Sequence, residues 1–407
     1  MSNSGGVGVG HMGPITRVVT QLSGYLAAQG HDVTIADAFN QRARDRLPSN
    51  VNLVESANRS ASDIFANFAG RSLSGLRREL QNSENQIVAF LKESDFSQYD
   101  LVHIHEPRLA AKICKASHVP CVFSCHTPNE WIALERYDSS RGKLRLLLLK
   151  LHEYIGHSDL AVMRRCATTV VLGSHVTSAV EQLSPSVTPK LHIVPNGMDM
   201  REWRRLDQHV ARGELHENQC SFRLVTIARL MPDKGIDVLL KAVRILNDKI
   251  KNLHVDVIGD VPAQADTAYR DSLRRESASL PVDWHGFISN QSRDYQQLLA
   301  AADLGVVPSL RDNQPTVVLE MLACGIPVVG SNLSGIPSMV SRQVGRLFPP
   351  GDHQALADVI YELHQQPGEI ADMRDRSRDH VESHFSWDAI AAKYSRVFEQ
   401  VLNSRRH

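Results

Sequence analysis

The chain has 407 residues, which is long enough for two ordinary domains and too long for a single core. Its 45 Lys and Arg residues balance 45 Asp and Glu residues, so a broad cationic surface for nucleic acid is not expected. No stretch is apolar for long enough to span a bilayer, and the polar first residues predict no signal peptide. Six cysteines without a paired metal-ligand spacing indicate reduced thiols in a cytoplasmic protein.

Short apolar runs alternate with amphipathic stretches through the first half of the chain. Apolar residues between Ile15 and Leu26 recur at helical spacing and predict a helix. The runs that read as strands cover residues 31–36, 101–105, 121–125, 168–172 and 191–194. This alternation is typical of a parallel, doubly wound sheet.

The same pattern restarts in the second half, which predicts two Rossmann-like domains in one chain. Its strands are expected at residues 222–228, 254–258, 282–285, 304–307 and 327–330. The polar segment 204–219 fits a linker, and the final amphipathic stretch 387–402 follows no new strand. We therefore expect an N-terminal domain at 1–203, a second domain at 204–385, and a C-terminal helix at 386–407 that crosses back to the first domain.

A glycine-rich loop opens the chain. Gly8, Gly10 and Gly13 match the spacing of a dinucleotide fingerprint, and Asp37 lies near the place of its ribose-binding acid. That fingerprint needs a preceding strand, and only residues 1–7 precede it. The pattern favours a loop for another phosphate-bearing ligand over NAD, with a merely flexible terminus as the alternative. Because the central first strand would be poor or missing, we expect the chain to start late.

Metal-binding patterns are weak. His152 and His157 are five residues apart and leave a shared helical face, while His103 and His105 share a strand face without an evident third ligand. No Asp-x-Asp pair occurs, which removes a common carboxylate clamp for a metal and a diphosphate. The sequence therefore predicts no metal and no cofactor, and a diphosphate would be held by cations and backbone N–H groups.

Two cations follow the first strand of the second half. Arg229 stands directly after that strand, and Lys234 follows five residues later. Ligands of open α/β sheets bind at the carboxyl ends of strands, and the helix near Gly235 adds the positive end of its dipole. Taken alone, Arg229 and Lys234 are equally consistent with an anion site and with two ordinary surface cations.

The segment after the fourth strand of the second half favours the anion site. Pro315 suits a helix start, where Thr316 and Val317 offer N–H groups to an anion. Glu320 lies on the first turns, where its carboxylate is placed to accept hydrogen bonds from a ribose. Asp312 lies on the preceding loop and is placed to hold sugar hydroxyls.

Four motifs together resemble the large retaining family of GT-B glycosyltransferases called group 4. They are Pro195–Asp199, Arg229–Gly235, Val257–Asp260 and Asp312–Gly325, and they occur in the family's order. The resemblance covers nearly the whole chain. It implies the GT-B fold, with two Rossmann-like doubly wound domains facing across a cleft that holds the donor.

The chain departs from the family pattern at one acid. The family usually carries two glutamates separated by seven residues, and here Asp312 replaces the first while Glu320 is kept. A glycine common in this stretch is also replaced around Gln314 and Pro315. The shorter side chain of Asp312 changes which sugar hydroxyls it is able to reach.

The resemblance implies a role for each candidate residue. Arg229 and Lys234 would bind the donor diphosphate, and Glu320 would bind the ribose. Asp312 would hold the transferred sugar. The N–H groups near these acids, on Thr316 and Val317, would complete that grip.

Two further residues match the family in the first half of the chain. His126, in the sequence Cys-His-Thr-Pro, matches the histidine that faces the donor sugar. Gly13 matches the glycine loop whose backbone approaches the phosphates. On the sequence alone, His126 reads as an ordinary histidine at a strand end.

The resemblance therefore implies a metal-independent hexosyltransferase that retains anomeric configuration. Family frequency favours a UDP-sugar donor over a GDP-sugar, with a glycan or lipid-linked acceptor in polysaccharide or glycoconjugate synthesis. A sugar-nucleotide epimerase and a catalytically silent nucleotide-binding module of the same fold are alternatives. Retention of Arg229, Lys234 and Glu320 speaks against the silent module.

A basic, leucine-rich stretch lies in the expected acceptor domain. In residues 141–151, four cations flank a run of leucines. Such a helix is suited to peripheral contact with the inner membrane face, where lipid-linked acceptors lie. The alternative is a buried helix with cations at its edge.

Overall fold

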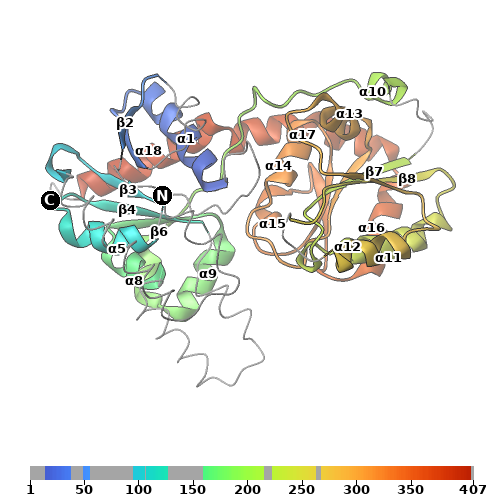
Figure 1. Cartoon of the computed structure of the whole chain (residues 1–407), viewed down its shortest axis with the longest axis horizontal. Helices are drawn as coiled ribbons and strands as arrows, with labels where there is room; N and C mark the ends of the chain where they lie inside the picture. The colour runs from blue at the N-terminus through green and yellow to red at the C-terminus, as the bar shows by residue number, and fades with distance from the viewer. Residues whose placement is uncertain are drawn as a thin grey trace. The chain divides into compact units, whose positions relative to one another are not determined.

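The computed structural model describes residues 14–37, 49–55, 95–105, 107–126, 159–214, 222–262 and 267–404. Contacts divide the chain into two compact units, drawn in Figure 1. Unit 1 comprises Met1–Gly197 and Ile390–His407, and unit 2 comprises Met198–Ala389. The expected boundaries after residues 203 and 385 stay predictions about which segments fold independently.

Unit 2 is built on a six-stranded parallel sheet in the order β12-β11-β10-β7-β8-β9. Its strands are β7 (Phe222–Ile227), β8 (Leu253–Ile258), β9 (Val282–Gly286), β10 (Leu304–Val307), β11 (Val328–Ser331) and β12 (Gly345–Phe348). The order is that of a doubly wound sheet, so the Rossmann-like prediction for the second half is confirmed. The pattern missed β12, whose sequence Gly-Arg-Leu-Phe contains no β-branched residue.

Helices cover both faces of this sheet (Figure 1). The helices of unit 2 are α10 (Gln208–Glu214), which packs on α13, and α11 (Ile236–Asn247), α12 (Ala268–Glu276), α13 (Arg293–Ala301), α14 (Thr316–Ala323), α15 (Ile336–Met339), α16 (His353–His364) and α17 (Pro367–Phe385). Successive strand residues point to opposite faces, which divides the core into two clusters. Leu224 and Val255 pack with α11 and α16, while Val225 and Ile258 pack with α13, α14 and α17.

The polar segment expected to be a linker is partly a helix attached to unit 2. Within α10, Arg212 forms an ion pair of 2.7 Å with Asp303 and donates a hydrogen bond to the carbonyl of Ala301. The Gln208 amide donates to the same carbonyl at 3.3 Å. Polar anchoring of this kind explains why a packed helix can carry few apolar residues.

Unit 1 contains two parallel sheets among its described residues. A pair of strands, β1 (Thr34–Asp37) and β2 (Asn52–Glu55), forms one sheet. The other has the order β3-β4-β5-β6, with β3 (Val102–Ile104), β4 (Cys121–Cys125), β5 (Thr168–Val171) and β6 (Leu191–Ile193). The strand β2 lies outside the predicted runs.

The remaining described helical segments of unit 1 are α1 (Pro14–Ala28), α5 (Pro107–Ala116), α8 (Asp159–Arg165), α9 (Ser174–Leu183), and the 3-10 turns η1 (Phe96–Gln98) and η2 (Pro185–Lys190). Apolar residues of α5, α8 and α9 pack with β3, β4 and β5, and both Met163 on α8 and Phe123 on β4 are almost fully buried. Across the described residues, no helix is both long and apolar enough to span a bilayer.

The last helix, α18 (Trp387–Asn403), begins in unit 2 and continues in unit 1. The Tyr394 hydroxyl lies 3.0 Å from the Ser124 hydroxyl on β4. Ser395 donates a hydrogen bond of 2.9 Å to the Gln29 amide oxygen, just after α1. Polar contacts from adjacent residues of one helix therefore reach both β4 and the segment between α1 and β1.

Candidate functional site

The candidate site of unit 2 lies where the direction of the strand order reverses. β7 and β10 are hydrogen-bonded neighbours, with Leu304 paired to Leu224 and Gly305 to Val225. The sheet continues through β8 on one side and β11 on the other. In such sheets, ligands bind outside the carboxyl ends of the strands at this switch point.

Backbone hydrogen bonds join the loops that follow β7 and β10. The N–H groups of Leu310 and Arg311 donate to the Asp233 carbonyl at 2.8 and 3.1 Å. Gly235 adopts a left-handed conformation with φ of 64°, and a Cβ there would lie 2.1 Å from the Pro308 carbonyl oxygen. Glycine is therefore required for the start of α11 to approach this loop so closely.

Lys234 and Asp312 form an ion pair across these two loops. The Lys234 Nζ lies 2.6 Å from the Asp312 Oδ2, and the side chains are 13% and 17% exposed. A second carboxylate, Asp233, lies 3.8 Å from the same Nζ. The sequence had predicted separate partners for Lys234 and Asp312, whereas the fold pairs them directly.

Arg229 lies at the exposed side of the same carboxyl end. It follows β7 by two residues and forms no ion pair within the described part of the chain. Gly259 has φ of 134°, and a Cβ there would lie 1.8 Å from the Ala228 carbonyl oxygen. Glycine is therefore required for the chain after β8 to approach the chain after β7 this closely, beside Arg229.

Glu320 is a buried carboxylate on α14. The Tyr295 hydroxyl on α13 donates a hydrogen bond of 2.5 Å to its Oε2, and the Thr316 hydroxyl donates to Oε1 at 3.4 Å. Burial and the nearby Glu320 charge raise the pKa of Tyr295 well above its usual value. Burial and the same charge raise the pKa of Cys324 to about 12. Both groups therefore stay protonated beside Glu320 at neutral pH.

Sequence reasoning missed Tyr295. It occupies a buried position of an amphipathic helix, where a tyrosine is expected to belong to the hydrophobic core. Nothing in the sequence connects it with Glu320. Only the packing of α13 against α14 brings the two side chains together. Its ring also meets Trp203, with the ring centroids 6.1 Å apart.

The start of α14 carries the two expected backbone donors. Pro315 is the N-cap residue and has no N–H group, and the first bond of the turn runs from the Val318 N–H to the Pro315 carbonyl. Helix geometry leaves the N–H groups of Thr316 and Val317 without an intrahelical acceptor. An anion placed at this end would meet both donors and the positive end of the helix dipole.

His126 lies in unit 1, directly after β4. Its Nε2 is 3.0 Å from the Nδ1 of His105, and the two rings are stacked. Burial lowers the pKa of His126 to about 4. A neighbouring histidine, His103, lies 2.8 Å from the Ser124 hydroxyl, and burial followed by the His126 charge lowers its pKa to about 3. The imidazoles of His126 and His103 are therefore neutral at pH 7.

Several predicted features lie outside the described residues. They are Gly13 with the other glycines of the N-terminal loop, the histidine pair His152 and His157, and the basic stretch 141–151. Their predicted roles stay predictions.

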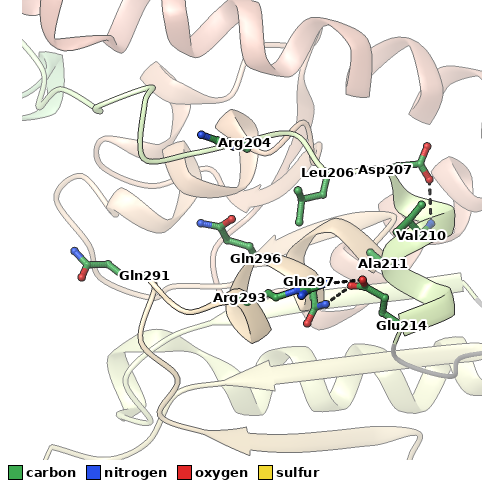
Figure 2. A pocket seen from close by; sticks show the side chains of 10 residues that line it. All are labelled: Arg204, Leu206, Asp207, Val210, Ala211, Glu214, Gln291, Arg293, Gln296 and Gln297. Atoms are coloured by element: carbon green, nitrogen blue, oxygen red, sulfur yellow. Dashed lines mark hydrogen bonds and ion pairs between the residues drawn. The ribbon is translucent and has the colours of Figure 1, made fainter.

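A separate pocket opens between α10 and α13, away from the predicted residues. It has a volume of about 450 Å³, and its lining includes Arg204, Glu214 and Arg293 (Figure 2). Arg293 pairs with Glu214 at 2.5 Å across it. Of the predicted donor-binding residues that the structure describes, none lines this pocket.

Comparison with known proteins identifies the family of both halves. The description "Glycosyltransferase Family 4" matches residues 15–202, and "Glycosyl transferases group 1" matches residues 221–366. D-inositol 3-phosphate glycosyltransferase of Actinosynnema mirum is 26% identical over 94% of this chain and 90% of the relative. The amylovoran biosynthesis glycosyltransferase AmsK of Erwinia amylovora is 30% identical over 47% of this chain, and the match spans 47% of that relative.

Solved structures of low identity share the fold. Sucrose-phosphate synthase from Thermosynechococcus elongatus has a TM-score of 0.71 at 19% identity, covering 96% of this chain and 94% of that chain. Anabaena HepE in complex with UDP and glucose has a TM-score of 0.66 at 18% identity, covering 96% and 97%. The chain therefore belongs to the group 1, family 4 type of glycosyltransferases and has the GT-B fold.

Proposed function

We propose that this chain transfers a sugar from a nucleotide-diphosphate donor to a hydroxyl group of a glycan or lipid-linked acceptor, with retention of anomeric configuration. The observation that carries the proposal is the Lys234–Asp312 pair at the switch point between β7 and β10. A cation and a carboxylate held there can contact a diphosphate and the hydroxyls of the attached sugar together. We favour a UDP-sugar, and the UDP and glucose bound to HepE support that choice.

The proposed diphosphate contacts come from two kinds of positive group. Arg229 and Lys234 supply full charges from the loop after β7, and the N–H groups of Thr316 and Val317 supply directional donors. When the donor bond breaks, negative charge accumulates on the departing diphosphate. Preorganised cations and N–H groups lower the energy of that state because they need not reorganise as the charge forms.

The two acids, Glu320 and Asp312, are proposed to contact opposite ends of the donor. Glu320 would accept hydrogen bonds from the ribose hydroxyls, and Tyr295 orients its carboxylate from behind. Asp312 would accept from hydroxyls of the transferred sugar while it remains close to Lys234. Its ion pair supports this role, since Lys234 is able to bridge the carboxylate and a phosphate oxygen at once.

The first half is proposed to supply the acceptor side and part of the donor contact. His126 would meet the transferred sugar as a neutral imidazole, which is able to donate or accept a hydrogen bond without adding charge. Gly13 would bring the backbone of its loop close to the phosphates. Residues 141–151 would contact the membrane surface, and flotation with anionic liposomes at low salt tests that contact.

The proposed function is tested by incubating the purified chain with UDP-, GDP- and ADP-sugars and a panel of glycan and lipid-linked acceptors. We expect one donor class to yield a product of retained configuration, measured by mass spectrometry and NMR. Conversion of the donor sugar without an acceptor would instead indicate an epimerase. Stabilisation by a nucleotide without any turnover would indicate a silent binding module.

The Lys234→Ala variant is the internal control for this assay, and Lys241→Ala is its matched comparison. Lys241 is an exposed lysine on α11 whose pair with Asp237 spans 3.3 Å. Activity lost in the first variant and kept in the second assigns turnover to the proposed site. Equal activity in both variants would reject the assignment.

A further inference from the structure

A cluster of ionisable side chains lies within the sheet of unit 2, apart from the loops of the candidate site. Asp256 on β8 is paired in register with Asp283 on β9, and Arg223 on β7 is paired with His254 on β8. Paired residues of parallel strands, and residues two apart on one strand, point to the same face. The four side chains therefore share one face of the sheet.

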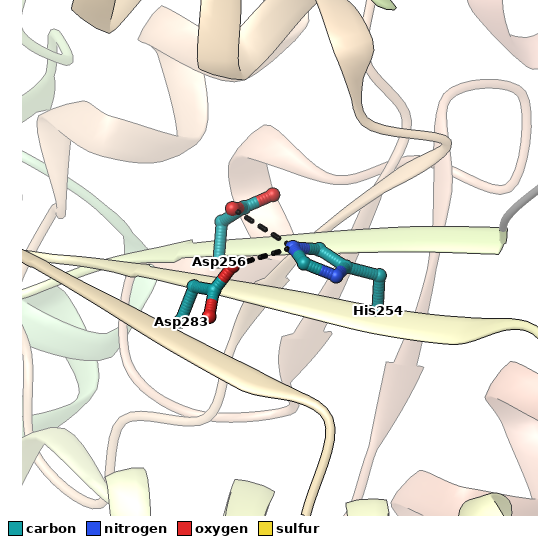
Figure 3. A group of neighbouring side chains, drawn as sticks. All are labelled: His254, Asp256 and Asp283. Atoms are coloured by element: carbon teal, nitrogen blue, oxygen red, sulfur yellow. Dashed lines mark ion pairs between the residues drawn. The ribbon is translucent and has the colours of Figure 1, made fainter. Parts of the chain in front are cut away.

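The imidazole of His254 points between two carboxylates from different strands (Figure 3). Its Nε2 lies 3.4 Å from the Asp256 Oδ1 and 3.4 Å from the Asp283 Oδ2, and the ligand atoms of all three residues lie within 4.8 Å of one another. Within the part of the chain that the structure describes, this buried nitrogen makes no hydrogen bond. An N–H···O bond has a typical length of about 2.9–3.0 Å, so both distances are long for one.

The same distances suit ligands of one small cation. Zinc binds imidazole nitrogen at about 2.0–2.1 Å and carboxylate oxygen at about 2.0–2.2 Å, in tetrahedral geometry. Two ligand atoms of such a tetrahedron lie about 3.3–3.5 Å apart. His254 therefore stands at the separation from each carboxylate that a shared zinc ion would set.

Neighbouring side chains orient the central carboxylate. Arg223 donates to the Asp256 Oδ2 at 2.6 Å, and the His285 Nε2 lies 2.8 Å from Oδ1. His285 lies two residues after Asp283 on β9, so its side chain points to the same face of the sheet as the other four. Outer hydrogen bonds of this kind are typical of carboxylates that bind a metal.

We propose that His254, Asp256 and Asp283 form a binding site for a divalent transition metal, with zinc as the ion it fits. Imidazole favours zinc over magnesium, and the remaining coordination position would be taken by water. His254 lies four residues before the end of β8, about 13 Å from the carboxyl edge where the candidate site lies. The site has a structural role, in which the metal fastens the edge strand β9 to β8.

The proposal is tested on the full chain prepared without a polyhistidine tag and stripped of metal with a chelator. Titration with Zn²⁺ by calorimetry, with bound metal measured by mass spectrometry, is expected to give one ion per chain. Mg²⁺ is expected to give no binding. Zinc should also raise the unfolding temperature, because it binds the folded chain in preference to the unfolded one.

Three variants locate the ion. His254→Gln and Asp283→Asn are expected to lose stoichiometric binding, and His285→Ala is expected to weaken it by about 10- to 100-fold. Asp283 is exposed, so Asp283→Asn is expected to leave the fold intact. His353→Gln, which changes an exposed histidine at the start of α16, is the matched control and should bind zinc as the unchanged chain does.

A second measurement separates a structural ion from a catalytic one. The rate of sugar transfer below the unfolding temperature should be the same with and without zinc, and the same in His254→Gln. Failure of the metal-stripped chain to bind zinc would overturn the proposal. Zinc binding unaffected by both His254→Gln and Asp283→Asn would overturn it as well.

Discussion

Two ion pairs of unit 2 have the same length and different surroundings. Lys234–Asp312 and Arg223–Asp256 each span 2.6 Å. The first joins loops after β7 and β10 and keeps 13% and 17% of its side chains exposed, whereas the second lies within the strands and is 1% and 0% exposed. A pair on loops is able to exchange a partner for a ligand, while a pair inside a sheet is held by its neighbours.

The buried pair also shows how a charge is kept inside a sheet. Burial alone would raise the pKa of Asp256, but His254, His285 and the Arg223 guanidinium hold it well below its usual range. Asp256 therefore stays ionised and needs its partners. By contrast, the carboxylate of Asp312 meets a flexible lysine at a loop, where an incoming phosphate oxygen can share the cation.

The largest effect is expected from breaking the buried pair. Arg223→Met should lower the free energy of unfolding by about 3–5 kcal/mol, because it leaves the Asp256 carboxylate buried without its guanidinium. Urea unfolding measures the loss. Arg223→Met combined with Asp256→Leu should recover most of it, since both charges are then absent. A loss below about 1 kcal/mol in the single variant would mean that the two pairs are energetically alike.

Substitutions of the loop cations are expected to lower catalysis and to leave folding intact. Lys234→Ala and Arg229→Ala should each lower sugar transfer by about 100- to 1000-fold, since each removes a charge that stabilises the departing diphosphate. Their unfolding midpoints should stay close to that of the unchanged chain. The measurement is kcat/KM for the donor, together with urea unfolding. Near-normal turnover in both variants would refute their proposed role.

A third variant addresses Glu320, which combines burial with a proposed ligand contact. Tyr295→Phe removes the 2.5 Å hydrogen bond to the carboxylate and should lower the free energy of unfolding by about 1–3 kcal/mol. It should also weaken nucleotide binding, measured by calorimetry, because the carboxylate loses its orienting donor. Tyr361→Phe is the control, since the Tyr361 hydroxyl makes no hydrogen bond within the described chain. Equal behaviour of the two variants would remove Tyr295 from the site.

A pH dependence of stability is expected from the buried imidazoles of unit 1. Burial lowers the pKa of His126 to about 4 and of His103 to about 3, against about 6.5 in an unfolded chain. Between pH 6.5 and 4 the unfolded chain binds protons that the folded chain does not. Stability should therefore fall as pH falls through this window, by at most about 1.4 kcal/mol per pH unit for each histidine.

Urea unfolding at pH 7 and pH 5 checks this dependence. His126→Gln should make the stability less dependent on pH, whereas His353→Gln, at an exposed site, should leave the dependence unchanged. A flat stability profile in the unchanged chain between these pH values would contradict neutral, buried histidines.

Much of the fold could be predicted because its strands and helices follow patterns of apolar residues that are local in the sequence. The runs that became β7, β8, β10 and β11 are short, apolar and rich in Val and Ile, and each is followed by a helical period. Local signals were weak at β12 and α10. Pairing with β11 determines β12, and polar contacts to Asp303 and the Ala301 carbonyl determine α10. These are contacts between residues far apart in the chain, which a local sequence pattern does not predict.

For the candidate site as well, the sequence predicted the residues but not which of them are neighbours in space. The sequence placed Arg229 and Lys234 after one strand, and Asp312, Thr316 and Glu320 after another. It could not show that these strands are neighbours. Only the sheet order brings the two loops together and pairs Lys234 with Asp312.

The sequence by itself determined the family, the two series of strands and helices, and the candidate residues of the donor site. It could do so because periodicity and motif spacing depend on residues close along the chain. The tertiary structure decided the partners of those residues: Tyr295 for Glu320, Asp312 for Lys234, and two carboxylates for His254. These contacts join residues far apart in the chain, and they exist only because strand order and helix packing close the distance between them.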